Sequence, residues 1–146
     1  MSQITGRDTR PELLLRSLLH RRGFRFTVNG PLNKQLPGRP DLVLPKHNTV
    51  IFVHGCFWHG HQKCKHFRLP KSRTEWWKDK IGKTQERDYQ NEESLRAEGW
   101  NVLVVWECAF ENLKSVEDLE KRLIKEGPLR LATKRAFPSQ RPWVLD

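Results

Sequence analysis

Residues 54–64 hold more side chains able to do chemistry than any other stretch of the chain. They read His-Gly-Cys-Phe-Trp-His-Gly-His-Gln-Lys-Cys, so three histidines, two cysteines and two adjacent aromatic residues share one turn-rich segment. Imidazoles and thiolates bind zinc, an imidazole also transfers protons near neutral pH, and exposed aromatic rings stack on bases. Metal binding, acid–base chemistry and base stacking are therefore the kinds of chemistry to consider.

The first group of candidate ligands has the spacing Cys56-x4-His61-x2-Cys64, which suits zinc. A structural zinc takes four ligands, so a fourth must come from elsewhere. Two residues could supply it: Cys108, at the end of an expected strand, and His66, two residues after Cys64. We favour Cys108, because it accounts for all three cysteines and ties the loop to that strand. Four protein ligands leave no open position, so this zinc would be structural.

His54 and His59 are then free for proton transfer. Asp41 starts a short apolar segment, and a carboxylate at the edge of a buried strand is costly unless it is paired or bound to a cation. We expect Asp41 to hold Mg²⁺, with the main-chain carbonyl of Val53 as a second oxygen ligand. His59 would deprotonate an attacking water, and His54 would support the phosphate or the leaving group. These groups together indicate phosphodiester cleavage.

Glu12 has a simpler explanation and a functional one. The sequence Thr9-Arg10-Pro11-Glu12 has the form of a capping box, in which a threonine and a glutamate three residues later satisfy the first turn of a helix. The cap is the preferred explanation for Glu12. Its carboxylate could still face a metal ion or a water beside one.

Two aromatic residues, Phe57 and Trp58, lie within the loop that zinc would brace. A metal-braced loop cannot easily bury two adjacent large rings, whereas exposed rings can enter between base pairs as a wedge. Trp77, or Trp76, on the helix that follows could join them. The loop is therefore also a candidate DNA-contacting surface.

The composition favours a nucleic-acid partner. Lys and Arg number 27 against 17 Asp and Glu, which gives a net charge of +10, and six tryptophans are present. A basic surface attracts polyanions, and aromatic residues among basic ones suit base stacking. An odd number of cysteines favours a metal site or free thiols over disulfides. With no secretory signal and no apolar run of membrane-spanning length, we expect a single cytoplasmic domain over residues 1–146.

The expected elements form an α/β core, a small mixed sheet flanked by helices. Periodicity and turn signals predict strands at residues 24–28, 41–44, 49–53 and 101–106. A tight turn over residues 45–48 is expected to join the second and third of these strands as a hairpin. They predict a first helix after Thr9 that ends at Gly23, helical runs from Ser72 or Thr74 and over 84–98, and a last helix from Ser115 to about Lys125. Residues 30–40 are expected to be a loop, and residues 128–146 form a basic tail. Trp100 and Trp106 are expected to pack in the core.

Taken in order, several segments resemble the very short patch repair endonucleases, the Vsr family. The matching segments cover about residues 5–110, and they are 8–12 (Asp-Thr-Arg-Pro-Glu), 36–41 (Leu-Pro-Gly-Arg-Pro-Asp), 54–59 (His-Gly-Cys-Phe-Trp-His), 73–77 (Arg-Thr-Glu-Trp-Trp), 80–83 (Lys-Ile-Gly-Lys), 87–88 (Arg-Asp) and 99–108. The combination is highly specific.

The resemblance implies a restriction-endonuclease-like fold with a structural zinc loop. It implies a DNA mismatch endonuclease that nicks one strand on the 5′ side of the thymine in a T:G mismatch, which arises when 5-methylcytosine deaminates. It implies Mg²⁺ at Asp41, catalytic roles for His54 and His59, and Glu12 assisting near the metal-bound water. It also implies four ligands of a structural zinc, which are Cys56, His61, Cys64 and Cys108. It implies three residues that intercalate into DNA, which are Phe57, Trp58 and Trp77.

The expected substrate is double-stranded DNA with a T:G mismatch. The protein is expected in a bacterial-type cytoplasm, associated with the nucleoid. Mismatch-repair proteins and a cytosine-5 DNA methyltransferase are expected associates, and the chain is expected to be a monomer. Two other functions stay open: a relaxed-specificity nickase or restriction-type nuclease on the same core, and a zinc-stabilised DNA-binding module without catalysis. Asp41 together with both histidines argues against the module.

Overall fold

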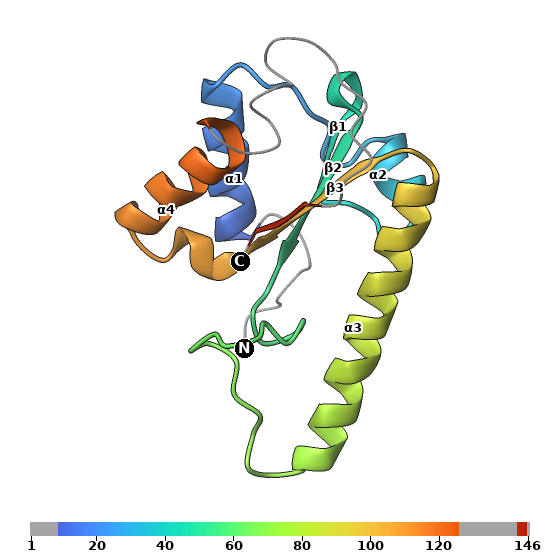
Figure 1. Cartoon of the computed structure of the whole chain (residues 1–146), viewed down its shortest axis with the longest axis vertical. Coiled ribbons are helices and arrows are strands. Elements are labelled where there is room, and N and C mark those ends of the chain that lie inside the picture. The colour runs from blue at the N-terminus through green and yellow to red at the C-terminus, as the bar shows by residue number, and fades with distance from the viewer. Residues whose placement is uncertain (1–8, 126–142, 146) are drawn as a thin grey trace.

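The computed structural model describes residues 9–125 and 143–145, and within them the chain forms a mixed sheet flanked by helices (Figure 1). The sheet has four strands in the order β1-β2-β3-β4, which are Leu42–Leu44, Thr49–His54, Asn101–Trp106 and Trp143–Leu145. Strands β1 and β2 are antiparallel, whereas β2, β3 and β4 are parallel. The predicted α/β class with a small mixed sheet is therefore confirmed.

Helices cover both faces of this sheet. Helices α1 (Arg10–Arg21) and α4 (Leu113–Glu120) lie on one face, and α2 (Pro31–Gln35) and α3 (Thr74–Ala97) lie on the other (Figure 1). Short turns of 3-10 helix follow β1 and β3, and a π-helical turn over residues 121–125 extends α4. None of the described helices is long and apolar enough to cross a membrane.

Strand residues alternate between the two faces, because successive side chains of a strand point in opposite directions. Ile51 and Leu103 pack with α1 and α4, whereas Phe52 and Val104 pack with Leu95 of α3. His54 ends β2 with the same parity as Phe52, so it belongs to the face covered by α3. The alternation therefore directs His54 toward α3, which begins twenty residues later in the chain.

Several predicted elements are confirmed. The hairpin of β1 and β2 pairs Val43 with Val50, and the hydroxyl of Thr9 caps α1 by accepting from the Glu12 N–H at 3.4 Å. The strand at residues 101–106 lies inside the sheet, between β2 and β4. Trp100 and Trp106 pack against the apolar cluster beneath α3.

The prediction of a strand at residues 24–28 is wrong. Only Thr27 pairs with a strand, through two main-chain hydrogen bonds to Val43 of 2.9 and 3.1 Å. The chain then leaves the sheet because the side-chain carbonyl of Asn33 accepts from the Thr27 hydroxyl and from the Gly30 N–H, which fixes the start of α2. The predicted loop over residues 30–40 accordingly contains a short helix.

The predicted helix boundaries also need correction. The two runs predicted from Ser72 or Thr74 and over 84–98 form one continuous helix, α3, because a single interior glycine, Gly82, costs only about 1 kcal/mol in a long helix. Helix α4 begins before Ser115, because Asn112 supplies the cap by accepting from the Ser115 N–H at 2.9 Å. Asp8 of the first matching segment and residues 126–142 and 146 of the tail lie outside the described residues. The described end of the tail forms β4.

Candidate active site

Asp41 lies at the point where β1 meets the end of β2. Its Oδ2 accepts a hydrogen bond from the main-chain N–H of Val53 at 2.7 Å. Burial raises the pKa of Asp41 to about 7, against the hydrogen bond from Val53, which lowers it, and with a further increase from the neighbouring Glu12 carboxylate. The hairpin thus places the Asp41 carboxyl group, which is poorly solvated when charged, next to Val53, the residue before His54.

Glu12 approaches the same carboxyl group from α1. Its side chain is almost fully buried, and its Oε2 accepts from Nη2 of Arg16 at 3.2 Å. A side-chain hydrogen bond and a charge interaction with Glu12 both raise the pKa of Asp41. The structure therefore brings Glu12 and Asp41 together, in addition to the capping contact of the Glu12 main chain with Thr9.

His54 and His59 form a stacked pair. Their ring centroids are 3.8 Å apart and their planes are 4° from parallel. Nδ1 of His59 lies 2.6 Å from Oδ2 of Asp88 on α3. Burial, followed by the charge of His59, lowers the pKa of His54 to about 4, so His54 is neutral at physiological pH.

The stacked pair suits proton transfer better than metal binding. One ligand atom each from His54, His59 and Asp88 lie within 4.8 Å of one another, which is close enough to consider a shared ion. However, a metal binds an imidazole nitrogen in the plane of its ring, and two parallel planes stacked at 3.8 Å have no position in common. The arrangement resembles instead an imidazole whose tautomer is fixed by a carboxylate.

A cavity of about 210 Å³ brings the carboxyl group and the imidazoles together. Asp41, His54 and His59 all line it. The other lining residues are Gly38, Arg39, Phe52, Val53, Asp88, Asn91 and Glu92. Three of the four side chains for which a catalytic role is predicted therefore share one solvent-accessible space, at the open end of the hairpin and on the loop beyond it. The fourth, Glu12, does not line this cavity but contacts Asp41 from α1.

Asp88 was not singled out by sequence reasoning, which included it in a matching segment but gave it no role. A usable signal exists in α3. The buried residues Ile81 and Leu95 define its inward face, and positions 85, 88 and 92 continue that face at helical spacing. The polar residues there, Gln85, Asp88 and Glu92, are therefore directed inward, where polar side chains need a partner or a function.

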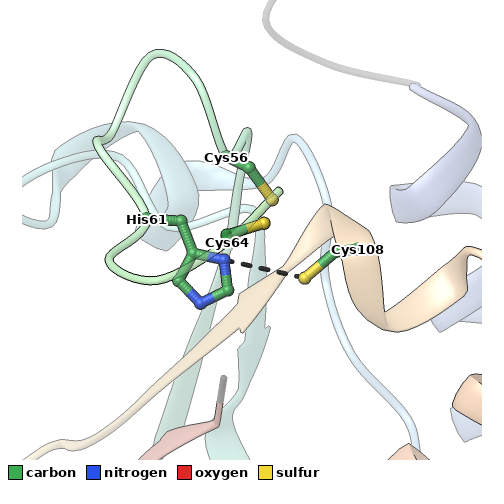
Figure 2. A group of neighbouring side chains, drawn as sticks. All are labelled: Cys56, His61, Cys64 and Cys108. Carbon is green, nitrogen blue, oxygen red and sulfur yellow. Dashed lines mark hydrogen bonds between the residues drawn. The ribbon is translucent and has the colours of Figure 1, made fainter. Parts of the chain in front are cut away.

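The structure brings the candidate zinc ligands together. Ligand atoms of Cys56, His61, Cys64 and Cys108 lie within 4.8 Å of one another. Figure 2 shows three of them on the loop after β2 and Cys108 on the segment after β3, all directed to one space, with Sγ of Cys108 3.6 Å from Nδ1 of His61. Three sulfurs and one imidazole nitrogen form a donor set that suits tetrahedral zinc.

The local fold of the loop supports this cluster. The His61 N–H donates to the Cys56 carbonyl at 2.9 Å, and Glu107 accepts from the Cys56 N–H at 3.0 Å. Burial raises the pKa values of Cys56 and Cys108, so both thiolates would be unstable there without a cation. The donor set and its burial both fit a bound metal ion.

His66, the alternative fourth ligand, lies outside the cluster. Its side chain is 44 % exposed, and its Nε2 lies 2.5 Å from Oε1 of Glu111. Only its main chain approaches the cluster, through a 3.4 Å hydrogen bond from the His66 N–H to Sγ of Cys64. The geometry therefore favours Cys108 over His66.

Trp106 connects the two groups. Its ring stacks on His61 with centroids 4.1 Å apart and planes 7° from parallel, and it meets the ring of His54 edge-on at 5.2 Å. One core tryptophan thus contacts a residue of the sulfur cluster and a residue of the cavity. The two groups are parts of one packed unit.

The aromatic side chains of the loop and α3 form one cluster on the surface. Phe57 lies 5.2 Å from Trp58 and 5.3 Å from Trp77, measured between ring centroids, and Trp76 lies 4.8 Å from Trp77. Trp58 and Trp76 are about half exposed. The guanidinium carbon of Arg73 lies 4.7 Å from the centroid of the Trp76 ring. The structure therefore brings the predicted intercalating residues together. Of the two alternatives on α3, Trp77 contacts Phe57, and Trp76 contacts Trp77.

Comparison with known sequences identifies the family of the chain. The family model described as DNA mismatch endonuclease Vsr matches residues 1–66. The DNA mismatch endonuclease Vsr of Escherichia coli is 47 % identical over 133 residues, which cover 87 % of this chain and 83 % of that protein. The chain belongs to the Vsr family. The type II nicking enzyme V.XorIIP of Xanthomonas oryzae is 49 % identical over 80 % of this chain and 83 % of its own length. V.NmeAIP, a type II nicking enzyme of Neisseria meningitidis, is 44 % identical over 86 % of this chain and 87 % of its own length.

The Vsr match includes Asp41 and the whole of residues 54–64, and it ends before α3 begins. Asp88, which holds His59, and Cys108 of the sulfur cluster therefore lie beyond the family-model match. The longer alignments with the relatives extend over most of the chain. The resemblance stated from short segments is thus confirmed at the level of the family.

Proposed function

We propose that the chain is a Mg²⁺-dependent DNA endonuclease that nicks one strand on the 5′ side of the thymine in a T:G mismatch. The observation that carries this proposal is the shared cavity of Asp41, His54 and His59 in a member of the Vsr family. We further propose that residues 1–146 form a single nuclease domain with a restriction-endonuclease-like sheet.

Asp41 fits a cation ligand. Its carboxyl group is poorly solvated, and its pKa is raised to about 7, so a positive charge beside it would stabilise the carboxylate. We assign the main-chain carbonyl of Val53 as a second ligand, because the N–H of the same residue bonds the Asp41 carboxyl group and Val53 lines the same cavity. Oxygen donors suit Mg²⁺. When bound, Mg²⁺ would supply positive charge against the scissile phosphate. Glu12 would position Asp41 and the water near it.

His59 acts as the general base in this proposal. With Nδ1–H donated to Asp88 at 2.6 Å, the opposite nitrogen, Nε2, keeps its lone pair and can take a proton from the attacking water. His54 is neutral at physiological pH and would hydrogen-bond the phosphate or the leaving oxygen rather than neutralise its charge. The stack keeps the two imidazoles at a fixed separation.

The sulfur cluster has a structural role in this proposal. Zinc held by Cys56, His61, Cys64 and Cys108 would have no open position and would fix the loop on both sides of His59. The aromatic cluster of Phe57, Trp58 and Trp77 would enter the duplex at the mismatch, where base pairs are the easiest to unstack. The net charge of +10 favours binding to duplex DNA.

A nicking assay tests this function. Matched duplexes and duplexes with one T:G pair, labelled on either strand, are incubated with the protein with or without added Mg²⁺. We expect a nick 5′ of the mismatched thymine, in Mg²⁺ only. Equal cleavage of both duplexes would favour a relaxed nickase or restriction-type nuclease, and binding without cleavage would favour a non-catalytic zinc module.

A further inference from the structure

Gln85 of α3 holds the main chain of the loop at His59. Its side-chain nitrogen donates to the carbonyl of His59 at 3.3 Å and to the carbonyl of Gly60 at 3.1 Å. A glutamine amide carries two N–H donors, so both contacts can be made at once. Asp88 follows one turn later on the same helix and binds the His59 ring. One face of α3 therefore contacts both the main chain and the side chain of His59.

Gly60 allows the loop to approach the helix this closely. Its φ of +63° lies in the left-handed region, which glycine adopts at little cost. A Cβ at this position would overlap the side-chain amide of Gln85 and lie 2.8 Å from Cγ2 of Ile81. The residue is buried, and so is Ile81 below it. Gly60 and Gln85 are therefore matched: the missing side chain of one makes room for the amide of the other.

We propose that Gln85 is a positioning residue for His59, with Gly60 as the residue that makes its contact possible. The proposal rests on the proposed role of His59 as general base. Cys56 and His61 fix the loop on either side of His59, and within it the Gly60 N–H donates to the Phe57 carbonyl at 3.2 Å. The hydrogen bonds from Gln85 tie the peptide between His59 and Gly60 to α3. Gln85 fixes that peptide relative to Asp88, so that the imidazole meets its carboxylate partner and the cavity together.

The size of the effect follows from the precision that catalysis needs. A displacement of a catalytic group by about 1 Å can lower the rate by roughly 100-fold. Without the Gln85 amide, the Gly60 carbonyl would keep only the longer hydrogen bond from Nε2 of Gln62 at 3.4 Å, and the His59 carbonyl would lose its Gln85 donor in a partly buried site, so the loop would shift. The exposed rings proposed to contact DNA belong to other residues of the loop and of α3, so binding of DNA should change little.

The test compares Gln85→Met, which keeps the length of the side chain but removes its donors, with Gln90→Met, an exposed position on the same helix. At saturating T:G duplex, we expect Gln85→Met to lower the single-turnover nicking rate by roughly 10- to 100-fold. The dissociation constant for the duplex and the zinc content should stay within about twofold of the wild type. Gln90→Met should match the wild type in all three measurements.

A second variant, Gln85→Glu, keeps the shape and places a carboxylate against two carbonyls, so its rate should fall further than that of Gln85→Met. Wild-type nicking by Gln85→Met, or a loss of zinc and DNA binding in proportion to the loss of rate, would overturn the positioning role. The function itself is judged separately: it fails if the wild-type protein leaves the T:G duplex intact, whatever the variants do.

Discussion

The imidazole rings of His54 and His59 lie face to face, with centroids 3.8 Å apart. Two such rings cannot both carry a positive charge at low cost, because like charges at this distance repel strongly. The surroundings of the two rings differ. His54 is buried and its pKa is lowered to about 4, whereas His59 has the carboxylate of Asp88 at 2.6 Å. His54 is therefore held in its neutral form beside a ring that a carboxylate holds in place.

The burial of His54 predicts a pH-dependent stability. Its pKa is about 4 in the folded chain and 6.5 ordinarily, so the unfolded chain binds the proton more readily. The full stability is present above pH 6.5 and falls as the pH decreases toward 4, by at most about 3 kcal/mol. The His54→Gln variant should lose this part of the slope in urea unfolding at a series of pH values. An unchanged slope would show that His54 ionises freely in the folded state.

Asp41→Asn should abolish nicking and stabilise the metal-free protein. The pKa of Asp41 is about 7 in the folded chain and 3.8 ordinarily, so folding favours its protonated form, and its contribution to stability is lost as the pH rises from 3.8 through 7. At about pH 8 without added Mg²⁺, the amide should raise the free energy of unfolding by roughly 1–3 kcal/mol. Nicking and chemical denaturation measure the two effects. Asp79→Asn, at an exposed position of α3, is the control that should change neither. Retained nicking by Asp41→Asn would refute the metal role.

Asp88→Asn should lower the nicking rate by roughly 100-fold or more, because an amide can stabilise the wrong tautomer of His59. The substitution keeps the shape of the side chain, so duplex binding and the melting temperature should be nearly unchanged. Single-turnover nicking at saturating duplex measures the effect. A rate within about threefold of the wild type would remove Asp88 from the mechanism.

Cys108→Ser should lose the bound zinc, whereas His66→Gln should keep it. The sulfur of Cys108 lies 3.6 Å from the His61 ring, and the side chain of His66 is exposed and paired with Glu111. Metal analysis of the purified variants gives the zinc content, and thermal melting shows whether the loop still folds. Because a structural zinc contributes directly to folding, Cys108→Ser should also melt at a lower temperature. Zinc bound by Cys108→Ser but not by His66→Gln would reverse the ligand assignment.

Removing the exposed rings should weaken mismatch recognition more than stability. Stacking of a base on an aromatic ring contributes roughly 1–3 kcal/mol, so Phe57→Ala combined with Trp58→Ala should lower the preference for T:G duplexes by about tenfold or more. Trp58 is 49 % exposed, and Leu13→Ala, at a 50 % exposed position on α1, is the control. Competition binding with matched and mismatched duplexes measures the preference. An unchanged preference in the double variant would remove these rings from recognition.

Local patterns in the sequence were sufficient for several parts of the fold. The Thr9 cap, the turn at Pro45–His47 that closes the hairpin, and the β-branched run of β3 each depend on residues within a few positions of one another. The candidate ligands between Cys56 and Cys64 are equally local. The prediction of a strand at residues 24–28 was wrong because it depends on a residue outside that segment. The contacts of Asn33, six residues after Thr27, end the pairing with the sheet.

The sequence by itself determined which side chains are available: a carboxylate before a strand, a loop rich in histidine and cysteine, and a stripe of polar residues on a long helix. Only the tertiary structure decided which of them meet. Asp88 and Gln85 reach His59, and Cys108 rather than His66 completes the sulfur cluster, because α3 and β3 pack against β2 and its loop. Periodicity states which face of an element is buried, but the partner across that face is set by the packing of segments that are distant in the chain.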